Sequence, residues 1–172
     1  GNLVAVFGGA VLCCDPSGKT RWVRRQEWIA PQEDPDWARQ YQQPAIAWKD
    51  RLLVAQPGVA AVECIDADSG ALIWRKVIPG LRRMDGIVDD RLIVESQTGL
   101  TALSADKGES IWVHLAGDLL DAQLCGGPGG VVYARREKGP DSTLRPVLVW
   151  LDMQTGRPKA YCPLEPLKHA YP

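Results

Sequence analysis

Residues 64–74 read CIDADSGALIW, a polar corner that closes on a glycine and reaches a tryptophan four residues later. Three further stretches follow the same plan: Leu12–Trp22 (LCCDPSGKTRW), Ala102–Trp112 (ALSADKGESIW) and Trp150–Ala160 (WLDMQTGRPKA). Their glycines stand at positions 18, 70, 108 and 156, so the repeat recurs every 52, 38 and 48 residues. A period in the forties with strand-like sequence between the marks is typical of a propeller-like array.

The segments between the corners predict short antiparallel strands, because β-branched and apolar runs alternate there with Gly, Pro and Asp turns. The third repeat predicts strands at residues 84–88, 91–95, 100–104 and 110–114. The fourth predicts strands at 120–124, 131–135, 147–151 and 158–162, with a glycine-rich bend at 126–130 and a loop at 137–146. We therefore expect an all-β chain of four antiparallel four-stranded blades, the first incomplete with three strands. The blades are predicted at residues 1–25, 45–78, 84–115 and 119–163, with an insertion at 26–44.

The composition narrows the classes of partner. The chain has 172 residues, of which 45% are hydrophobic and 24% charged, and its net charge is −1. Without a basic excess, nucleic acid is not expected as a partner. No apolar stretch approaches the roughly 18 residues needed to span a bilayer, so we expect no membrane insertion. We expect the chain to be part of a longer protein.

Each residue type in the repeated corner has a physical task. Glycine tolerates the positive φ of a tight turn, and a nearby carboxylate can accept hydrogen bonds from the turn's amides. Aligned on glycine, the carboxylate position holds Asp66, Ser104, Asp152 and, in the first repeat, Cys14. The last position holds Trp22, Trp74 and Trp112 but Ala160 in the fourth repeat. We expect these tryptophans to be buried between neighbouring blades.

The repeats resemble those of the quinoprotein dehydrogenase-like β-propellers, whose docking motif reads Ala-x-Asp-x-x-Thr-Gly-x-x-x-Trp. The second repeat matches it with Asp66, Gly70 and Trp74, and the third with Ala102, Gly108 and Trp112. The fourth keeps Asp152, Thr155 and Gly156, and the first keeps Gly18 and Trp22. The resemblance covers the whole chain and implies that it forms part of a PQQ-type propeller.

The resemblance leaves the activity open. In this family the motif docks neighbouring blades, both in pyrroloquinoline quinone enzymes and in non-enzymatic propellers. One of the latter is the lipoprotein scaffold of bacterial outer-membrane protein assembly. The resemblance also implies an extracytoplasmic setting, periplasmic or at the cell surface.

No group of residues in the sequence predicts a catalytic or cofactor site. Alcohol-oxidising relatives hold a vicinal disulfide against the quinone, but Cys13 and Cys14 lie inside the docking motif. Successive side chains of a strand point to opposite faces, so we expect two separate thiols. The acids around Asp66 are interpreted as turn residues rather than calcium ligands. His114 is interpreted as a packed or rim residue, and we expect no cofactor and no metal.

The insertion carries Trp28, Trp37 and Tyr41 in a polar segment. These aromatic residues either fold back over the blade edge or contact a partner, since aromatic residues are enriched at binding hot spots. The basic doublets at residues 82–83 and 135–136 are interpreted as solvated loop or strand ends.

The sequence favours a non-catalytic interaction or scaffold module of a larger protein that binds through its loops. The alternatives are part of a quinone-dependent dehydrogenase and a sensor domain fused to an enzyme or receptor. A protein or peptide partner is expected. Self-association is expected as well, with two copies completing a ring and residues 165–172 adding a strand to the first blade of the partner copy.

Overall fold

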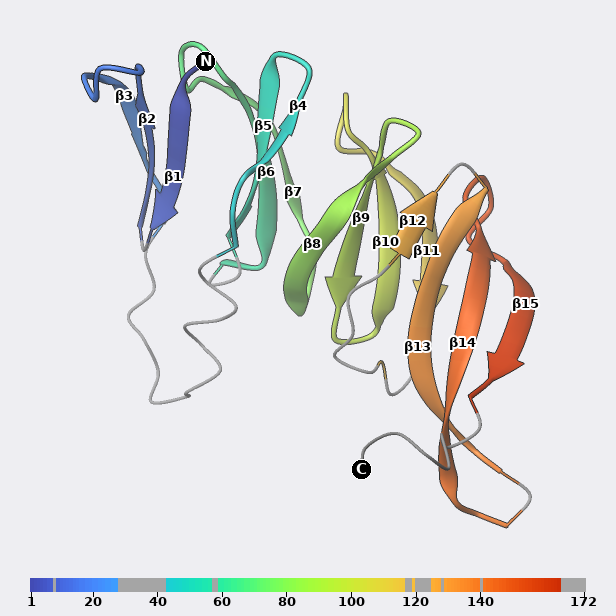
Figure 1. Cartoon of the computed structure of the whole chain (residues 1–172). Helices are drawn as coiled ribbons and strands as arrows, with labels where there is room; N and C mark the ends of the chain where they lie inside the picture. The colour runs from blue at the N-terminus through green and yellow to red at the C-terminus, as the bar shows by residue number, and fades with distance from the viewer. Residues whose placement is uncertain are drawn as a thin grey trace, which may run out of the picture.

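The computed structural model describes residues 1–7, 9–27, 43–56, 59–116, 119, 125–127, 129–139 and 141–164. Its strands form four antiparallel sheets that stand side by side in chain order (Figure 1). The first sheet has three strands and the others have four each. The predicted fold class is therefore confirmed, and the sheets are called blades 1 to 4 from here on.

Within every blade the strands lie in sequence order, each hydrogen-bonded to the next. Blade 1 comprises β1 (Leu3–Phe7), β2 (Ala10–Cys14) and β3 (Thr20–Arg25). Blade 2 comprises β4 (Ile46–Trp48), β5 (Arg51–Gln56), β6 (Ala61–Asp66) and β7 (Leu72–Val77). Blade 3 comprises β8 (Leu81–Val88), β9 (Arg91–Ser96), β10 (Gly99–Ser104) and β11 (Ser110–Leu115). Blade 4 comprises β12 (Cys125–Gly127), β13 (Gly130–Lys138), β14 (Leu144–Asp152) and β15 (Pro158–Pro163).

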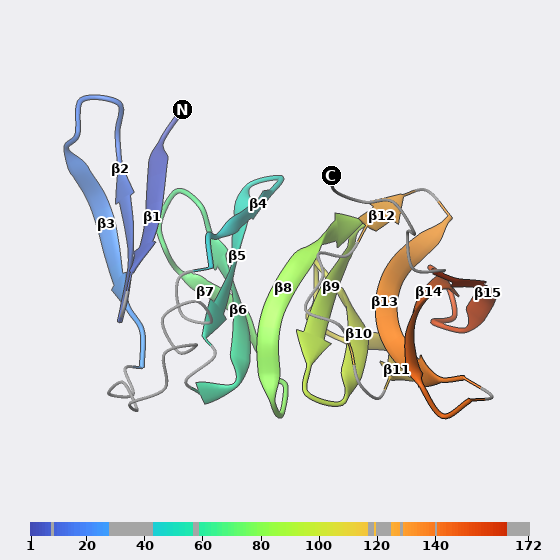
Figure 2. The same cartoon turned by 60° about the horizontal axis from the view of Figure 1, so that its bottom comes forward.

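The hydrophobic core lies between the blades. Side chains alternate across a strand, so Leu52 and Val54 of β5 pack against Val11 of blade 1, while Leu53 packs with Leu92 of blade 3. A third cluster joins blades 3 and 4 around Leu100, Tyr133, Val149 and Leu151. Figure 2 shows the same succession of stacked sheets from a second direction. A single blade cannot bury its apolar faces alone, which is the behaviour of a repeat array.

The fourth blade begins differently from the prediction. We expected a strand at residues 120–124, which lie outside the described residues, and a glycine-rich bend at 126–130. The structure instead places β12 at Cys125–Gly127, paired with β13 through Gly126 opposite Val131. A Cβ at Gly126 would lie 2.5 Å from Val88 Cγ2. The absence of a side chain therefore lets β12 approach β8.

The segment 137–146, expected to be a loop, is largely an extension of the β13–β14 hairpin. The register continues to Lys138 opposite Leu144. The tip is held by Asp141, whose Oδ1 accepts hydrogen bonds from the Thr143 hydroxyl at 2.6 Å and from its amide at 3.2 Å. The hydroxyl of Thr143, followed by the Arg145 guanidinium, lowers the pKa of Asp141 to about 2. Local capping thus allows a polar sequence to continue the strands.

No helix in the described part of the chain is long and apolar enough to cross a bilayer.

Candidate functional site

Carboxylates hold three of the four repeated corners, those of blades 1, 2 and 4. Asp66 Oδ1 accepts hydrogen bonds from the amide and hydroxyl of Ser69 at 2.7 and 2.6 Å. Asp152 Oδ1 accepts the corresponding pair from Thr155 at 2.8 and 3.0 Å. The Ser69 hydroxyl is the main cause that lowers the pKa of Asp66. The Lys159 ammonium is the main cause that lowers the pKa of Asp152 to about 2. Both carboxylates are ionised at neutral pH and are engaged in turn structure.

The first corner corrects the alignment made from the sequence. The residue that caps this corner is Asp15. Cys14, which the alignment placed in the carboxylate position, pairs with Thr20 inside the β2–β3 ladder. Asp15 Oδ1 accepts hydrogen bonds from the Ser17 hydroxyl at 2.6 Å and from the Lys19 amide at 3.0 Å. The turn from Asp15 to Gly18 is one residue shorter than the turns that end at Gly70, Gly108 and Gly156, while the register shift that follows Cys13 is common to all four blades. Alignment on the glycine alone could not detect that shortening.

Each docking tryptophan lies on the corner of the following blade. Trp112 Nε1 donates a hydrogen bond to the Met153 carbonyl at 2.8 Å, and a Cβ at Gly156 would lie 2.6 Å from its ring. The other two tryptophans make the same contacts one blade earlier: Trp22 with Ala67 and Gly70, and Trp74 with Ala105 and Gly108. The corner glycine is thus the surface on which the indole packs.

The three tryptophans differ in burial. Trp112 is 7% exposed, whereas Trp22 and Trp74 are half-buried. Trp22 and Trp74 are therefore less buried than the sequence predicted. The larger Met153 side chain belongs to the same buried cluster as Trp112, while Trp74 meets only an alanine, Ala105, at the equivalent position.

This series of contacts has no further member at either end of the described chain. Gly18 has open space where the other corners hold an indole. In blade 4 the docking position is Ala160, and the tryptophan stands opposite it on β14 as Trp150. Blade 2 has the reverse arrangement, with Cys64 on β6 opposite Trp74 on β7. Trp150 is 46% exposed, so blade 4 carries its aromatic side chain on a different strand.

Alanine substitution at two corner glycines separates backbone strain from indole packing. Gly18 and Gly156 have positive φ of 84° and 66°, so alanine costs roughly 1–2 kcal/mol at either one. At Gly156 the new Cβ also meets Trp112, and overpacking adds about 1–3 kcal/mol. Denaturant unfolding should therefore show Gly156→Ala to be more destabilising than Gly18→Ala. Equal losses would contradict packing of the indole on the glycine.

The two adjacent cysteines do not act as a pair. Cys13 is buried towards blade 2 and stands opposite Trp22, whereas Cys14 is half-buried on the other face of β2. Both are free thiols, and burial raises the pKa of Cys13. Neither side chain is placed as in a vicinal disulfide.

The remaining corner acids form ion pairs with the preceding blade. Asp68 lies 3.4 Å from Arg21 Nη1, and Asp106 lies 2.8 Å from Arg51 Nη1. Among the described residues, no three His, Cys, Asp or Glu side chains are grouped so that they could hold a metal ion.

His114 connects blades 3 and 4. Its Nε2 lies 2.7 Å from the hydroxyl of Tyr133, which is 1% exposed. Burial lowers the pKa of His114, and the positive charge of Arg135 adds to the effect. Burial likewise raises the pKa of Tyr133. This hydrogen bond is a packing contact between blades.

The basic doublets lie within strands rather than at their ends, and one arginine of each, Arg82 and Arg136, is exposed. Arg82 and Arg83 lie within β8, which starts at Leu81 rather than at residue 84. Arg83 Nε contacts Asp85 Oδ1 at 2.8 Å, and its Nη2 contacts Glu95 Oε2 at 2.8 Å. The two carboxylate side chains are only 6% and 4% exposed. The second doublet lies within β13, where Arg135 pairs with Glu137.

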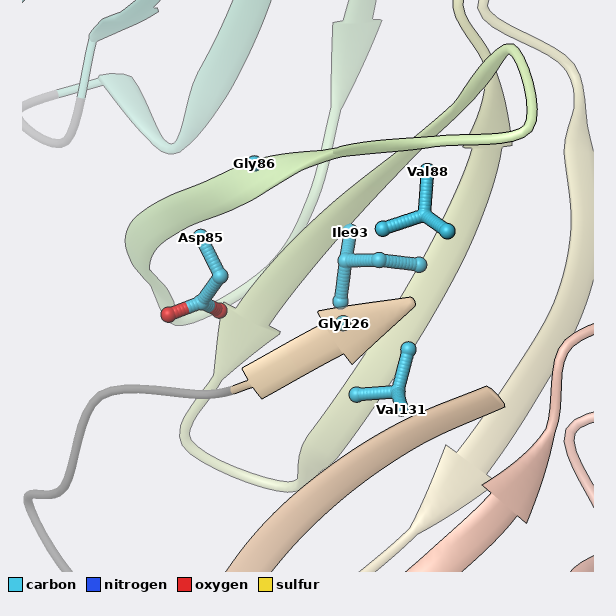
Figure 3. Close-up of a pocket in the computed structure, with 6 residues that line it drawn as sticks. All are labelled: Asp85, Gly86, Val88, Ile93, Gly126 and Val131. Atoms are coloured by element: carbon cyan, nitrogen blue, oxygen red, sulfur yellow. The ribbon is translucent and has the colours of Figure 1, made fainter. Parts of the chain in front are cut away.

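Asp85 is the most perturbed carboxyl of this group. It occupies a register shift between β8 and β9, and its Oδ2 has no hydrogen-bond partner. Burial, reinforced by the charge of Glu95, raises its pKa to about 7 against the opposing effect of Arg83. It lines a cavity of about 20 Å³, room for about one water, together with Gly86, Val88, Ile93, Gly126 and Val131 (Figure 3). The sequence did not predict the buried cluster of Arg83, Asp85 and Glu95. Its one local sign is the segment RRMDG at residues 82–86, which places two arginines beside an aspartate.

Several predicted residues cannot be placed. Trp28, Trp37 and Tyr41 of the insertion lie outside the described residues, as does the tail at 165–172 with His169. Their proposed partner contacts and strand exchange remain predictions.

Comparison with known proteins gives a family and a set of structural likenesses. Residues 8–159 match the family model described as outer membrane protein assembly factor BamB. A comparison with curated protein sequences finds no match. BamB from Moraxella catarrhalis is 13% identical with a TM-score of 0.57, over 93% of this chain and 48% of that one. The chain thus spans about half of that protein.

Two quinone enzymes share the fold as well. Quinohemoprotein alcohol dehydrogenase ADHIIG from Pseudomonas putida HK5 is 15% identical with a TM-score of 0.64, over 94% of this chain and 32% of that one. The enzyme from Comamonas testosteroni is 18% identical with a TM-score of 0.51, over 69% and 20%. At these identities the likeness shows the fold alone.

Proposed function

The chain belongs to the family of the outer membrane protein assembly factor BamB, and we propose that it is a non-catalytic scaffold module that binds protein partners. It is a PQQ-like propeller unit of four blades. The proposed setting is extracytoplasmic, periplasmic or at the cell surface, in keeping with the family's name.

The observation that carries this proposal is the apolar surface left exposed on blade 1. Leu3, Phe7 and Val23 are 64%, 48% and 55% exposed. The strand register places all three on the face turned away from blade 2, because they stand opposite Cys14, Ala10 and Leu12. Contiguous apolar surface of this kind marks interaction sites. It supports a partner that covers the sheet face.

The alternative, part of a quinone-dependent dehydrogenase, fits the described residues poorly. A quinone with calcium needs grouped oxygen ligands, whereas Asp66 and Asp152 cap their own corners. Cys13 and Cys14 point to opposite faces of β2. No reaction step through a quinone is therefore derived.

Calorimetry with pyrroloquinoline quinone and calcium tests the non-catalytic part of the scaffold proposal. We expect no saturable heat, because the carboxylates that could ligate calcium are engaged in corners and ion pairs. A dehydrogenase of the structurally similar class would serve as the positive control. A micromolar site would overturn the proposal and favour the enzyme.

We also propose that the chain self-associates. Two copies could complete a ring if blade 4 of one copy covered the exposed face of blade 1 of the other. At such a junction the docking position of blade 4 would face the corner glycine of blade 1, Gly18. That position holds Ala160 rather than a tryptophan, so no indole would pack on Gly18.

A further inference from the structure

The last strand of blade 3 has an open edge. Within the part of the chain that the structure describes, β11 pairs with β10 on one side and ends the sheet on the other. A terminal strand presents a row of unpaired backbone N–H and C=O groups and can template pairing with another chain. Its six residues, SIWVHL, contain no formal charge and no proline. β11 therefore lacks the charge and the proline that commonly protect an edge, although it carries a bulge at Ile111 as the other three last strands do at the equivalent residue.

The last strands of the other blades carry such devices. β3 (TRWVRR) has three arginines, β7 (LIWRKV) has an arginine and a lysine, and β15 (PKAYCP) has a lysine and two prolines. Charged side chains and proline are common means of preventing edge pairing. Four equivalent edges in one chain thus provide an internal comparison, in which β11 alone has neither a charged residue nor a proline.

β11 also presents a row of exposed apolar side chains. Ile111, Val113 and Leu115 are 42%, 61% and 74% exposed. They alternate with Trp112, which faces blade 4, and with His114, whose ring contacts Tyr133. The exposed row therefore lies on one face of the strand, along the open edge.

We propose that two copies of this chain pair through β11, antiparallel, across a two-fold axis at Val113. In this register Val113 stands opposite its own copy, and Ile111 stands opposite Leu115. On the other face Trp112 stands opposite His114. Each pair joins uncharged residues, and aliphatic or aromatic cross-strand pairs stabilise a sheet. The result is one continuous sheet of two four-stranded blades.

A second copy is the favoured occupant because the row is symmetric in chemistry about Val113. The equivalent register on β3 would place Arg21 opposite Arg25, and on β7 it would place Arg75 opposite itself. Like charges directly opposite each other are destabilising. On β15 the same register brings a proline to the edge. Self-pairing is therefore compatible with β11 and with none of the other three edges.

The inference rests on the self-association proposed above and names its surface. Sedimentation velocity of the 172-residue chain from about 1 to about 500 µM should show a concentration-dependent dimer. Val113→Lys places two ammonium groups opposite each other and should weaken the dimer at least roughly tenfold. Val113→Thr, which keeps a β-branched side chain, should leave it largely intact.

Val23→Lys is the matched control. Val23 also follows a docking tryptophan and is 55% exposed, but it lies on the face of blade 1 that a ring-forming dimer would cover. A dimer weakened by Val113→Lys and not by Val23→Lys supports pairing through β11. The reverse result overturns it and supports ring completion. A monomer throughout overturns both, and equal weakening indicates a general charge effect and overturns β11 pairing. None of these results bears on quinone binding, which the calorimetry tests separately.

Discussion

Replacing Trp112 by alanine is expected to lower the free energy of unfolding by about 3–5 kcal/mol, the usual cost of truncating a buried aromatic side chain. Trp112 is 7% exposed and joins blades 3 and 4 within a single apolar cluster. The substitution also leaves the Met153 carbonyl without the indole hydrogen bond. Denaturant unfolding followed by circular dichroism would measure the loss.

Trp150→Ala is the control within the same chain. Trp150 is 46% exposed on β14 and stands opposite Ala160 rather than on another blade's corner. Its truncation should cost clearly less than that of Trp112, with Trp74→Ala between the two because Trp74 is half-buried. Similar losses at all three positions would show that the indoles do not act as docking residues between blades.

Asp85→Asn is expected to change the pH dependence of stability. The folded pKa of Asp85 is raised to about 7 by burial, above the ordinary value near 4 of the unfolded chain. Between these values the folded state holds a proton that the unfolded state has released. The contribution of Asp85 is thus favourable at acid pH and is lost as the pH rises through about 7.

The stability of the variant relative to the wild type should consequently increase as the pH rises. The difference in unfolding free energy, variant minus wild type, should increase by on the order of 3 kcal/mol between pH 5 and pH 8. Comparing the two proteins removes the titration of groups they share, including His114. A difference independent of pH would show that Asp85 is ionised throughout this range, held so by Arg83.

The sequence and the structure agree most closely where the chemistry is local. A corner of Asp, Ser or Thr, and Gly specifies its own hydrogen bonds, so Asp66 and Asp152 could be assigned from the sequence. The same reasoning failed at the first corner, because the turn from Asp15 to Gly18 has one residue fewer than the turn from Asp66 to Gly70. Alignment on the glycine assumes turns of equal length, and only the hydrogen bonds of the folded turn show which residue caps it.

The sequence by itself determined the repeat, the all-β class and the blade-to-blade role of the tryptophans, since each depends on a short pattern that recurs. Only the tertiary structure decided which side chains meet. Asp85 and Glu95 became buried neighbours because β8 and β9 pair around Arg83. β11, whose sequence has neither charge nor proline, became an exposed edge because it is the last strand of its sheet. Such relations arise from contacts between residues distant in sequence, and propensity and periodicity carry no information about them.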